Sequence, residues 1–255
     1  MRLTVVGSSA GWPTADNPSS CYLLAAGGIH VLLDVGYAAF PALTRMLAPE
    51  SVDAVLITHG HPDHVADLHP LLRARGLRGL QPPPLQVYAL PGAIDAVLAL
   101  DGPGHADGAC RVSLINPGQP FSVGHLAVTT QPLPHFVPNV GFRLTNRDGS
   151  VLAYTGDAGP HPSAPDLFRG ADLLLAEATF AESLPAGWDG LLSTAEDAAR
   201  LAAASGAGAL ALTHLWPDSD PEVHVQAARR HFAGPVYVAR PGLSFQVAGR
   251  SLALS

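Results

Sequence analysis

The sequence predicts a protein of the α/β class, with strands and helices alternating along the chain. Short apolar runs recur from the first residues to the last, and segments with helical spacing lie between some of them. Glycine and proline, with 26 and 24 of the 255 residues, are scattered between the runs as turn residues. Because single helices interrupt runs of strands, we expect partly antiparallel sheets with the helices packed outside.

The expected elements follow from these patterns in chain order. Strands are predicted at 3–6, 22–24, 30–34, 54–57, 86–88, 126–130, 141–145, 151–154, 173–176, 209–213, 236–238 and 244–247. Helical spacing predicts helices over 37–47, 65–75, 92–100, 194–205 and 222–232. Ser193 is the candidate N-cap of the fourth helix, with Glu196 and Asp197 in its first turn. Asp220 and Pro221 mark the start of the last helix.

Residues 81–119 are the least regular part of the chain. They contain three consecutive prolines at 82–84 and a Gly-Pro-Gly-His run at 102–105. This composition predicts an excursion or a lid-like loop. The sequence shows no linker, tandem repeat or low-complexity tract, so we expect a single domain over residues 1–255.

The charge balance is acidic and contains no lysine. All 14 basic residues are arginine, against 21 aspartates and glutamates, which gives a formal net charge of −7. Broad, non-specific binding to nucleic acid needs a positive surface, so this balance argues against it. This balance does not exclude a small local patch that holds one phosphate.

The cysteines and the apolar pattern bear on where the protein works. Cys21 and Cys110 are too few for a disulfide scaffold or a thiolate zinc site. The apolar run at 3–6 is too short for a signal peptide, and no stretch approaches the roughly 18 apolar residues of a membrane span. We therefore expect a reduced, cytoplasmic protein that does not associate with membranes.

The most informative motif is Thr-His-Gly-His-Pro-Asp-His at 58–64, directly after the apolar run 54–57. Three imidazoles and one carboxylate so close together are costly to solvate, and the imidazoles repel one another when protonated, unless a cation organises them. Imidazole and carboxylate ligands suit zinc, iron or manganese in hydrolytic sites.

The spacing within this motif predicts two groups of ligands. Residues two apart in a strand share a face, so His59 and His61 can converge on one ion. Pro62 forces a turn, after which Asp63 and His64 open the following helix and can face a second ion.

The motif resembles the signature of the metallo-β-lactamase fold, and further matches follow in the order of that family. The early Asp-Val-Gly at 34–36 resembles the family's Asp-x-Gly, which supports the metal loop. His135, Asp157 and His214 match its third histidine, its bridging aspartate and its last histidine. The resemblance covers about residues 3–245. It implies an αββα sandwich, with two mixed sheets face to face, helices outside and metals at one edge.

The resemblance also implies two metal sites that share one carboxylate. The ligands are His59, His61 and His135 for one ion, Asp63, His64 and His214 for the other, and Asp157 between them. Most of them follow a predicted apolar strand, and sandwich folds carry functional groups on such loops. We expect two divalent ions, Zn²⁺ first, with Mn²⁺ or Fe²⁺ as alternatives. Asp63 is also the expected general base, because it can orient the water between the ions or take its proton.

Other segments resemble ribonuclease Z, the tRNA 3′-end endonuclease, and its phosphodiesterase-like relatives. The runs 176–179 and 192–194 match His-Glu-Ala-Thr and His-Ser-Thr of those nucleases, but Ala176 and Leu192 replace the two histidines. The second histidine is associated with assistance to the leaving group. The sequence also contains no Gly/Pro/Lys-rich arm of the kind that grips tRNA. We therefore expect a small-molecule or short phosphodiester substrate and no strong binding of nucleic acid.

Together these features predict a dinuclear metal-dependent hydrolase that cleaves a phosphodiester through a hydroxide held between the ions. A small ester, lactone or thioester is the alternative substrate. A non-catalytic metal-binding relative is the alternative of another class. A homodimer is also compatible with the sequence.

Several polar residues keep two interpretations. Glu177 orients a ligand histidine or caps a neighbouring turn, and Arg143 holds an anionic substrate or forms a surface pair. The aromatic residues form no stripe typical of a cofactor site. The remaining histidines are expected in surface or packing roles, although the last two lie in loops that could approach the site: His30, His69, His125, His224, His231, His105 and His161.

Overall fold

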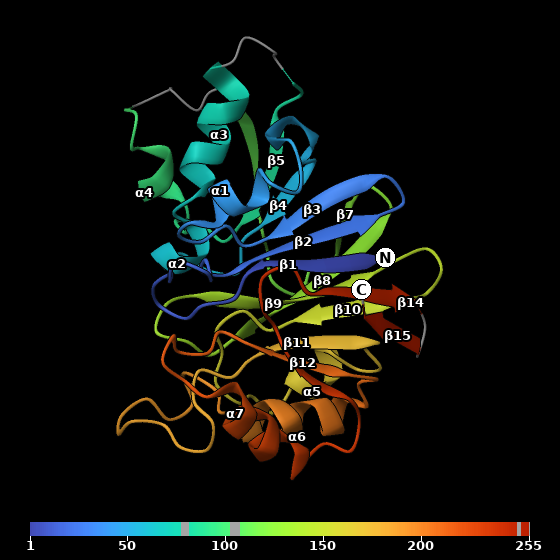
Figure 1. Ribbon diagram of the computed structural model, residues 1–255. Coiled ribbons are helices and arrows are strands. Elements are labelled where there is room, and N and C mark those ends of the chain that lie inside the picture. Colours follow the sequence, from blue (N-terminus) through green and yellow to red (C-terminus); the bar gives the residue numbers. More distant parts are fainter. Residues whose placement is uncertain (78–81, 103–107, 249–250, 255) are drawn as a thin grey trace.

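Two mixed β-sheets pack face to face, and helices cover both outer faces (Figure 1). The computed structural model describes residues 1–77, 82–102, 108–248 and, by backbone alone, 251–254. The architecture is the αββα sandwich that the sequence predicts. The single domain over 1–255 stays a prediction.

The first sheet has the strand order β15-β14-β1-β2-β3-β4-β5-β6. Neighbours from β3 to β6 are parallel, and all other neighbours are antiparallel. The strands are β1 Arg2–Gly7, β2 Cys21–Ala26, β3 Ile29–Leu33, β4 Ala54–Leu56, β5 Leu85–Ala89, β6 Cys110–Leu114, β14 Ser244–Ala248 and β15 Ser251–Leu254.

The second sheet has the order β13-β12-β11-β10-β9-β8-β7. Here β10 to β13 are parallel to one another, and β7 to β10 are joined by antiparallel pairs. The strands are β7 Phe121–Val123, β8 Leu126–Leu133, β9 Asn139–Thr145, β10 Val151–Tyr154, β11 Leu173–Glu177, β12 Leu210–Thr213 and β13 Val236–Val238.

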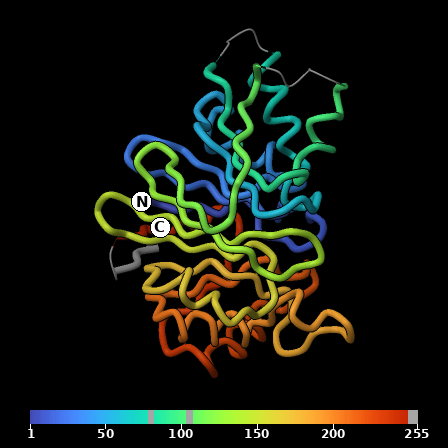
Figure 2. The backbone as a smooth tube through the Cα atoms, turned by 180° about the vertical axis from the view of Figure 1, so that it is seen from behind, coloured from blue at the N-terminus to red at the C-terminus, as the bar shows by residue number. Residues whose placement is uncertain are grey.

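Each sheet has its own helical layer, and the two layers lie at opposite ends of the molecule in Figures 1 and 2. Over the first sheet lie α1 Ala39–Leu43, α2 Pro62–Val65, α3 Leu68–Leu77, α4 Asp95–Leu98 and the 3-10 turn η1 Pro49–Ser51. Over the second lie α5 Ala164–Leu167, α6 Ala195–Ser205 and α7 Pro221–Arg229.

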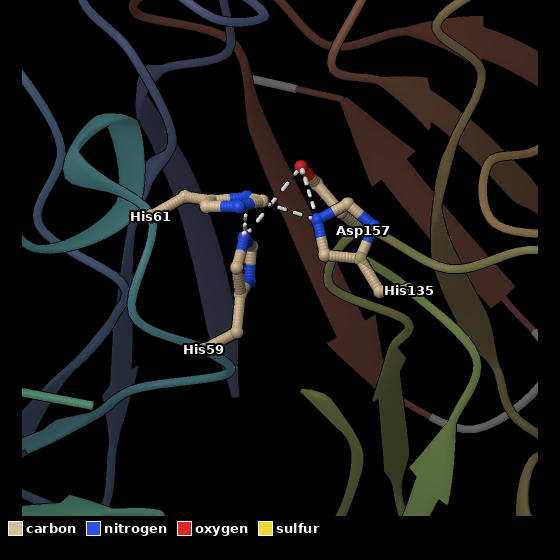
Figure 3. A group of neighbouring side chains, drawn as sticks. All are labelled: His59, His61, His135 and Asp157. Atoms are coloured by element: carbon tan, nitrogen blue, oxygen red, sulfur yellow. Dashed lines mark hydrogen bonds and ion pairs between the residues drawn. The ribbon is translucent and has the colours of Figure 1, made fainter. Parts of the chain in front are cut away.

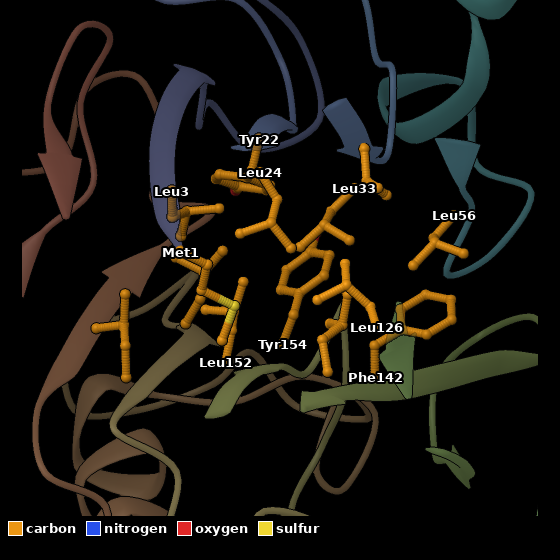
Figure 4. Packing of buried hydrophobic residues seen from close by; sticks show 14 of the residues in the cluster. Met1, Leu3, Tyr22, Leu24, Leu33, Leu56, Leu126, Phe142, Leu152 and Tyr154 are labelled. Carbon is orange, nitrogen blue, oxygen red and sulfur yellow. The ribbon is translucent and has the colours of Figure 1, made fainter. Parts of the chain in front are cut away.

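The central core fills the space between the two sheets (Figure 4). Successive side chains of a strand point to opposite faces, so Val31 and Leu33 of β3 enter this core while Leu32 packs under the helices. Phe142 and Tyr154 enter the core from the second sheet. The strands are apolar on both faces because each sheet is covered on both sides.

Several elements differ from the sequence prediction. Strands β6, β7 and β15 and helix α5 were not predicted, and the helices at 37–47 and 92–100 are much shorter than expected. At an edge, β6 exposes Arg111, Val112 and Leu114, so it lacks a buried apolar run. Thr194, not Ser193, is the N-cap of α6, because its side chain and that of Asp197 bond each other's backbone N–H groups. Asp220 caps α7 as predicted.

The lid-like interpretation of residues 81–119 is wrong for the part that the structure describes. That part forms β5, α4 and β6, and both strands extend the first sheet by parallel pairing. Residues 81 and 103–107 lie outside the described residues. The prolines at 82–84 precede β5 and do not interrupt it, so a strand follows them directly.

The strands that lead to the predicted site all end at one edge of the sandwich. In the second sheet, β10, β11 and β12 are parallel, and β8 runs in their direction because β9 is antiparallel to both β8 and β10. In the first sheet, β1, β3 and β4 share one direction for the same reason. Loops after these strands therefore meet at one place, which is where the site lies.

Candidate metal centre

Three histidines and one aspartate form the first group of converging side chains (Figure 3). His61 Nδ1 lies 3.1 Å from His59 Nε2 and 3.0 Å from His135 Nε2. Asp157 Oδ2 closes the group, 3.8 Å from His59 Nε2 and 3.9 Å from His135 Nε2. His59 and Asp157 are buried, and the two other side chains are half-buried. The four ligand atoms therefore surround a space of the size that one ion needs.

A second group shares the same aspartate oxygen. Asp157 Oδ2 lies 3.2 Å from both His64 Nε2 and His214 Nε2. Asp63 Oδ2 lies 3.2 Å from His214 Nε2 and 3.7 Å from His64 Nε2. All four residues are buried. The structure thus brings together all seven predicted site residues in the two sets that the sequence predicted, with Asp157 between them.

The local backbone differs from the sequence argument in one respect. Strand β4 ends at Leu56, so His59 and His61 lie in the loop after the strand and do not converge because of strand periodicity. Pro62 is the first residue of α2, one position earlier than predicted, and Asp63 and His64 lie in the helix's only full turn. The path of the loop brings His59 and His61 together, and His61 presents its Nδ1 atom to the group.

Asp34 orients the motif at 58–64 by accepting hydrogen bonds from it. Its Oδ1 accepts a hydrogen bond from the Thr58 backbone N–H at 2.8 Å. Its Oδ2 accepts from Thr58 Oγ1 at 2.9 Å, from His64 Nδ1 at 2.8 Å and from the Tyr154 hydroxyl at 2.8 Å. The side chain is fully buried. Gly36 belongs to the same Asp-x-Gly, and a Cβ there would lie 1.8 Å from the Asp63 carbonyl oxygen, so glycine is required.

These hydrogen bonds determine which nitrogen of each histidine is free. A carboxylate or a carbonyl can only accept, so His64 donates from Nδ1 to Asp34, and His135 donates from Nδ1 to the Leu191 carbonyl at 3.0 Å. Thr58 Oγ1 donates to Asp34 and therefore accepts from His59 Nδ1, 3.0 Å away. In all three imidazoles the proton sits on Nδ1, and the lone pair of Nε2 points into the site.

His214 is oriented in the same way from the second sheet. Thr179 Oγ1 donates to Glu177 Oε1 at 2.7 Å and lies 3.0 Å from His214 Nδ1, whose proton it accepts. Glu177 is buried at the end of β11 and also accepts from the backbone N–H groups of Ala158 and Ser193. Both interpretations of Glu177 therefore hold, because it positions a site histidine through Thr179 and anchors two neighbouring loops.

The donor set fits a divalent cation. With protons on Nδ1, the Nε2 atoms present lone pairs to one another and to carboxylate oxygens, so hydrogen-bond acceptors face acceptors. His64 Nε2 and Asp157 Oδ1 are buried without any hydrogen-bond partner among the described residues. Buried unpaired acceptors are costly, and a cation removes that cost. Imidazole and carboxylate ligands of this kind suit zinc and related metals.

The pKa shifts of the first group agree with this view. Burial lowers the pKa of His59 well below its ordinary value and also lowers the pKa of His61 and of His135, which keeps these imidazoles neutral. In the second group burial lowers the pKa of His64, but the surrounding carboxylates outweigh burial and raise it. Burial raises the pKa of Asp63 and of Asp157, but the nearby imidazoles outweigh burial and hold both values below the ordinary range. Neutral imidazoles and ionised carboxylates are the forms that bind metal.

Other predicted residues contribute no atom to either ligand group. Arg143 belongs to the outer face of β9 and donates to the Arg169 carbonyl at 2.7 Å, so it ties down the end of α5. His69 pairs with Asp101, His224 is buried in α7, and His161 is exposed beside Ser163. His30, His125 and His231 lie near Ser51, Gly27 and Glu196 respectively. His105 lies outside the described residues.

The sequence reasoning missed several supporting groups. Thr58 and Thr179 adjoin predicted motifs, so a hydroxyl beside the motif was an available signal. The backbone N–H of Gly11, which donates to Asp63 Oδ2 at 2.8 Å, comes from the loop after β1 and gives no such signal. Tyr154 bonds Asp34 across 120 residues and between the two sheets. Only the tertiary structure places these groups.

The fold and the paired His/Asp groups at one sheet edge define a metallo-hydrolase of the β-lactamase superfamily. The model of the β-lactamase superfamily domain matches residues 30–215, so the chain belongs to this family. The chain is 31% identical over 250 residues to the probable metallo-hydrolase YhfI of Bacillus subtilis, covering 96% of this chain and 100% of that protein. It is 28% identical over 276 residues to the ribonuclease Z of Gloeothece citriformis, covering 87% of this chain and 86% of that protein.

The solved structures agree. The crystal structure of the metallo-β-lactamase fold protein YhfI from Bacillus subtilis has a TM-score of 0.86 and 28% identity, covering 95% of this chain and 97% of that chain. The predicted resemblance to the metallo-β-lactamase fold near the ribonuclease Z branch is confirmed. None of the helices formed by the described residues has the length and apolar character that crossing a bilayer requires. The cytoplasmic location and the homodimer stay predictions.

We predict that Asp157→Ala reduces binding at both metal groups, whereas His214→Ala reduces it at one. Asp157 Oδ2 faces both groups, and His214 Nε2 faces only the second. Metal analysis after dialysis should show about two ions per chain in the wild type, almost none in Asp157→Ala and about one in His214→Ala. His161→Ala, at an exposed position, is the control. Equal losses in the two site variants would count against the shared carboxylate.

We predict that the affinity of the first ligand group for Zn²⁺ declines only below about pH 6.5, the ordinary pKa of histidine. The folded protein holds the pKa of His59, His61 and His135 below that value, so protons compete with metal only as the pH falls further. Each imidazole that takes up a proton lowers the affinity by up to about tenfold per pH unit. Titration against a competing chelator at a series of pH values measures this. Measured on the ion that His214→Ala retains, a decline centred above about pH 7.5 would contradict neutral, buried imidazoles in the first group.

Proposed function

We propose that this metallo-hydrolase is dinuclear and cleaves a phosphodiester. The observation that carries the proposal is the single oxygen, Asp157 Oδ2, shared by two groups of ligand atoms. Two divalent ions, with Zn²⁺ expected first and Mn²⁺ or Fe²⁺ as alternatives, would acidify a water and polarise the phosphoryl oxygen when bound. The first group would hold one ion through His59, His61 and His135, and the second would hold the other through Asp63, His64 and His214.

Asp63 is suited to act as the general base. Asp63 lies at the start of α2, and its Oδ2 accepts a hydrogen bond from the Gly11 N–H at 2.8 Å. Its Oδ1 makes no hydrogen bond within the described part of the chain. One oxygen can therefore face the metal group while the other receives a proton from the attacking water. His64 and His214 keep the pKa of this carboxyl below its ordinary range, so the proton acceptor is ionised at neutral pH.

The phosphodiester is supported by the relatives and by the segments shared with them. One similar protein is a ribonuclease Z, which by its name cleaves RNA. The Glu-Ala-Thr at 177–179 and the Ser-Thr at 193–194, which the sequence shares with that branch, both lie at the site, where Glu177 accepts from Ser193 N and positions His214 through Thr179. The expectation of weak nucleic-acid binding finds no support in this comparison. It stays a prediction from the charge balance and from the missing Gly/Pro/Lys-rich arm.

A small ester, lactone or thioester is the second candidate, and Leu192 is the observation that favours it. Leu191 holds His135 and Ser193 bonds Glu177, so the segment adjoins the site, yet Leu192 between them is apolar and buried. A thiolate leaves without protonation and needs no acid at this position. The complete set of ligand atoms argues against a non-catalytic relative, because nothing in the set is missing.

We predict that the protein hydrolyses bis(p-nitrophenyl) phosphate when supplied with Zn²⁺ or Mn²⁺, and that a chelator abolishes this activity. Asp63→Ala should lower kcat by about 10²–10⁴-fold, because the proton acceptor and a metal ligand are both lost. Asp95→Ala is the matched control, since Asp95 also lies in the first turn of a short helix but is exposed. Metal-loaded protein without turnover of any phosphodiester would exclude the proposed substrate class.

We predict that Leu192→His raises the rate on substrates with poor leaving groups. Nitrophenolate departs unprotonated, whereas the alkoxide of an RNA phosphodiester needs a proton, and a missing donor typically costs about 10²–10⁴-fold. The wild type should therefore cleave nitrophenyl esters far faster than precursor tRNA, and Leu192→His should narrow the difference. Comparable rates on both substrates, without a gain in the variant, would show that Leu192 does not limit the reaction.

A further inference from the structure

All three tryptophans of the chain gather beside the metal centre. Trp12, Trp188 and Trp216 are far apart in the sequence, and they lie in the loop after β1, the loop between β11 and α6, and the loop after β12. The loop between β11 and α6 projects from the body on the side of α2 in both views (Figures 1 and 2). The aromatic residues form no stripe in the sequence, so only the fold brings these rings together.

The rings form a continuous chain of contacts, here called the aromatic arc and made of Trp12, Trp216, Phe180, Trp188 and Phe136. The ring centroids of Trp12 and Trp216 are 4.9 Å apart, and those of Trp216 and Phe180 are 6.2 Å apart. Phe180 lies 6.1 Å from Trp188, and Trp188 lies 5.5 Å from Phe136. Four of the loops at the edge of the sandwich supply these rings.

Both ends of the arc are attached to the metal centre. At one end Phe136 follows His135, and the two rings are 5.3 Å apart. At the other end Trp12 follows Gly11, whose N–H holds Asp63. Trp216 packs over Gly11, where an added Cβ would lie 2.8 Å from the indole. The arc therefore extends from the first ligand group to the second.

The arc presents aromatic surface to solvent. Trp12 is 54% exposed and Phe136 is 47% exposed, and the other three rings are half-buried. Such surface costs free energy in water, and it is recovered when another flat ring stacks on it. The contacts within the arc are tilted or edge-on, with interplanar angles of 33° to 79°, so no two of its rings are fully stacked on each other.

We propose that the aromatic arc binds a flat aromatic group that the substrate carries on one side of its scissile phosphodiester. This inference rests on the proposed function, because the metal centre fixes where the phosphoryl group lies. A ring joined to that group by an ester bond reaches only nearby surfaces, and the arc is the aromatic surface attached to both ligand groups. Stacking depends on the ring's π-face and tolerates different rings, so the arc selects a flat group as a class.

The tryptophans make the arc directly observable, because all tryptophan fluorescence of the protein comes from it. We would titrate the Zn²⁺-supplied protein with phenylphosphonate and with cyclohexylphosphonate, which match in size and charge but differ in flatness. The expected result is a change in tryptophan emission and a Kd about fivefold or more lower for the phenyl compound. Equal Kd values for the two compounds would overturn the proposal.

Phe136 allows a variant that leaves every tryptophan in place. Phe136→Leu should reduce the preference for phenylphosphonate, and Phe136→Tyr, which keeps a ring, should retain it. Leu114→Ala, at an exposed apolar position on the edge strand β6, is the control that should change nothing. An unchanged preference in both Phe136→Leu and Trp12→Leu would also overturn the proposal. So would an emission that depends on protein concentration and not on phosphonate, because a second copy would then cover the arc.

Hydrolysis separates this inference from the proposed function. The rates on p-nitrophenyl phenyl phosphate and p-nitrophenyl cyclohexyl phosphate should differ in the same direction, since both release the same nitrophenolate. If neither compound is cleaved but phenylphosphonate still binds preferentially, the proposed phosphodiesterase activity fails and the arc stands. If both are cleaved equally and the two phosphonates bind equally, the arc fails and the activity stands.

Discussion

The buried carboxylate of Asp34 is the interaction on which the site depends. It lies after β3 of the first sheet, accepts a hydrogen bond from Tyr154 of the second, and holds Thr58 and His64 of the metal motif. Hydrogen bonds to a charged group contribute about 1.5–3 kcal/mol each, and removing the acceptor would leave several buried donors unpaired. One side chain therefore joins the two sheets, orients the loop after β4 and sets the protonated nitrogen of His64.

Hydrogen bonds in the polar layer above the core orient the histidines for metal binding. Asp34, Leu191 and Thr179 accept hydrogen bonds from the Nδ1–H groups of three histidines, so the lone pairs of the opposite nitrogens point inward. Asp157 adds an oxygen that faces both groups. The protein thus assembles acceptors against acceptors in a buried space, an arrangement that a cation stabilises. The sandwich below offsets the cost of this arrangement, because its core joins the two sheets through side chains from most of their strands.

Chemistry and selectivity come from different layers of the same edge. The ligands lie close to the strand ends, where the backbone is held by the sheets, and this gives them the precision that metal binding needs. The aromatic arc lies further out, on loops after β1, β8, β11 and β12, where sequence changes do not disturb the core. Leu192 illustrates the same separation, since a change at that single position alters the expected leaving group while Leu191 and Ser193 still bond the site through their backbone.

The sequence by itself determined the class of fold and four of the candidate ligands, because both depend on local patterns. The resemblance to the family supplied the other three, His135, Asp157 and His214. Apolar runs predict buried strands wherever both faces are covered, and the motif at 58–64 concentrates four candidate ligands within six residues. Strand β6 was not predicted, because it lies at the edge of its sheet, exposes most of its side chains and so has no buried apolar run. The tertiary structure alone decided which nitrogen each histidine presents, how Tyr154 reaches Asp34, and that three distant tryptophans enter one chain of ring contacts. These contacts join residues from different loops, and their geometry exists only once two sheets pack and their strand ends meet at one edge.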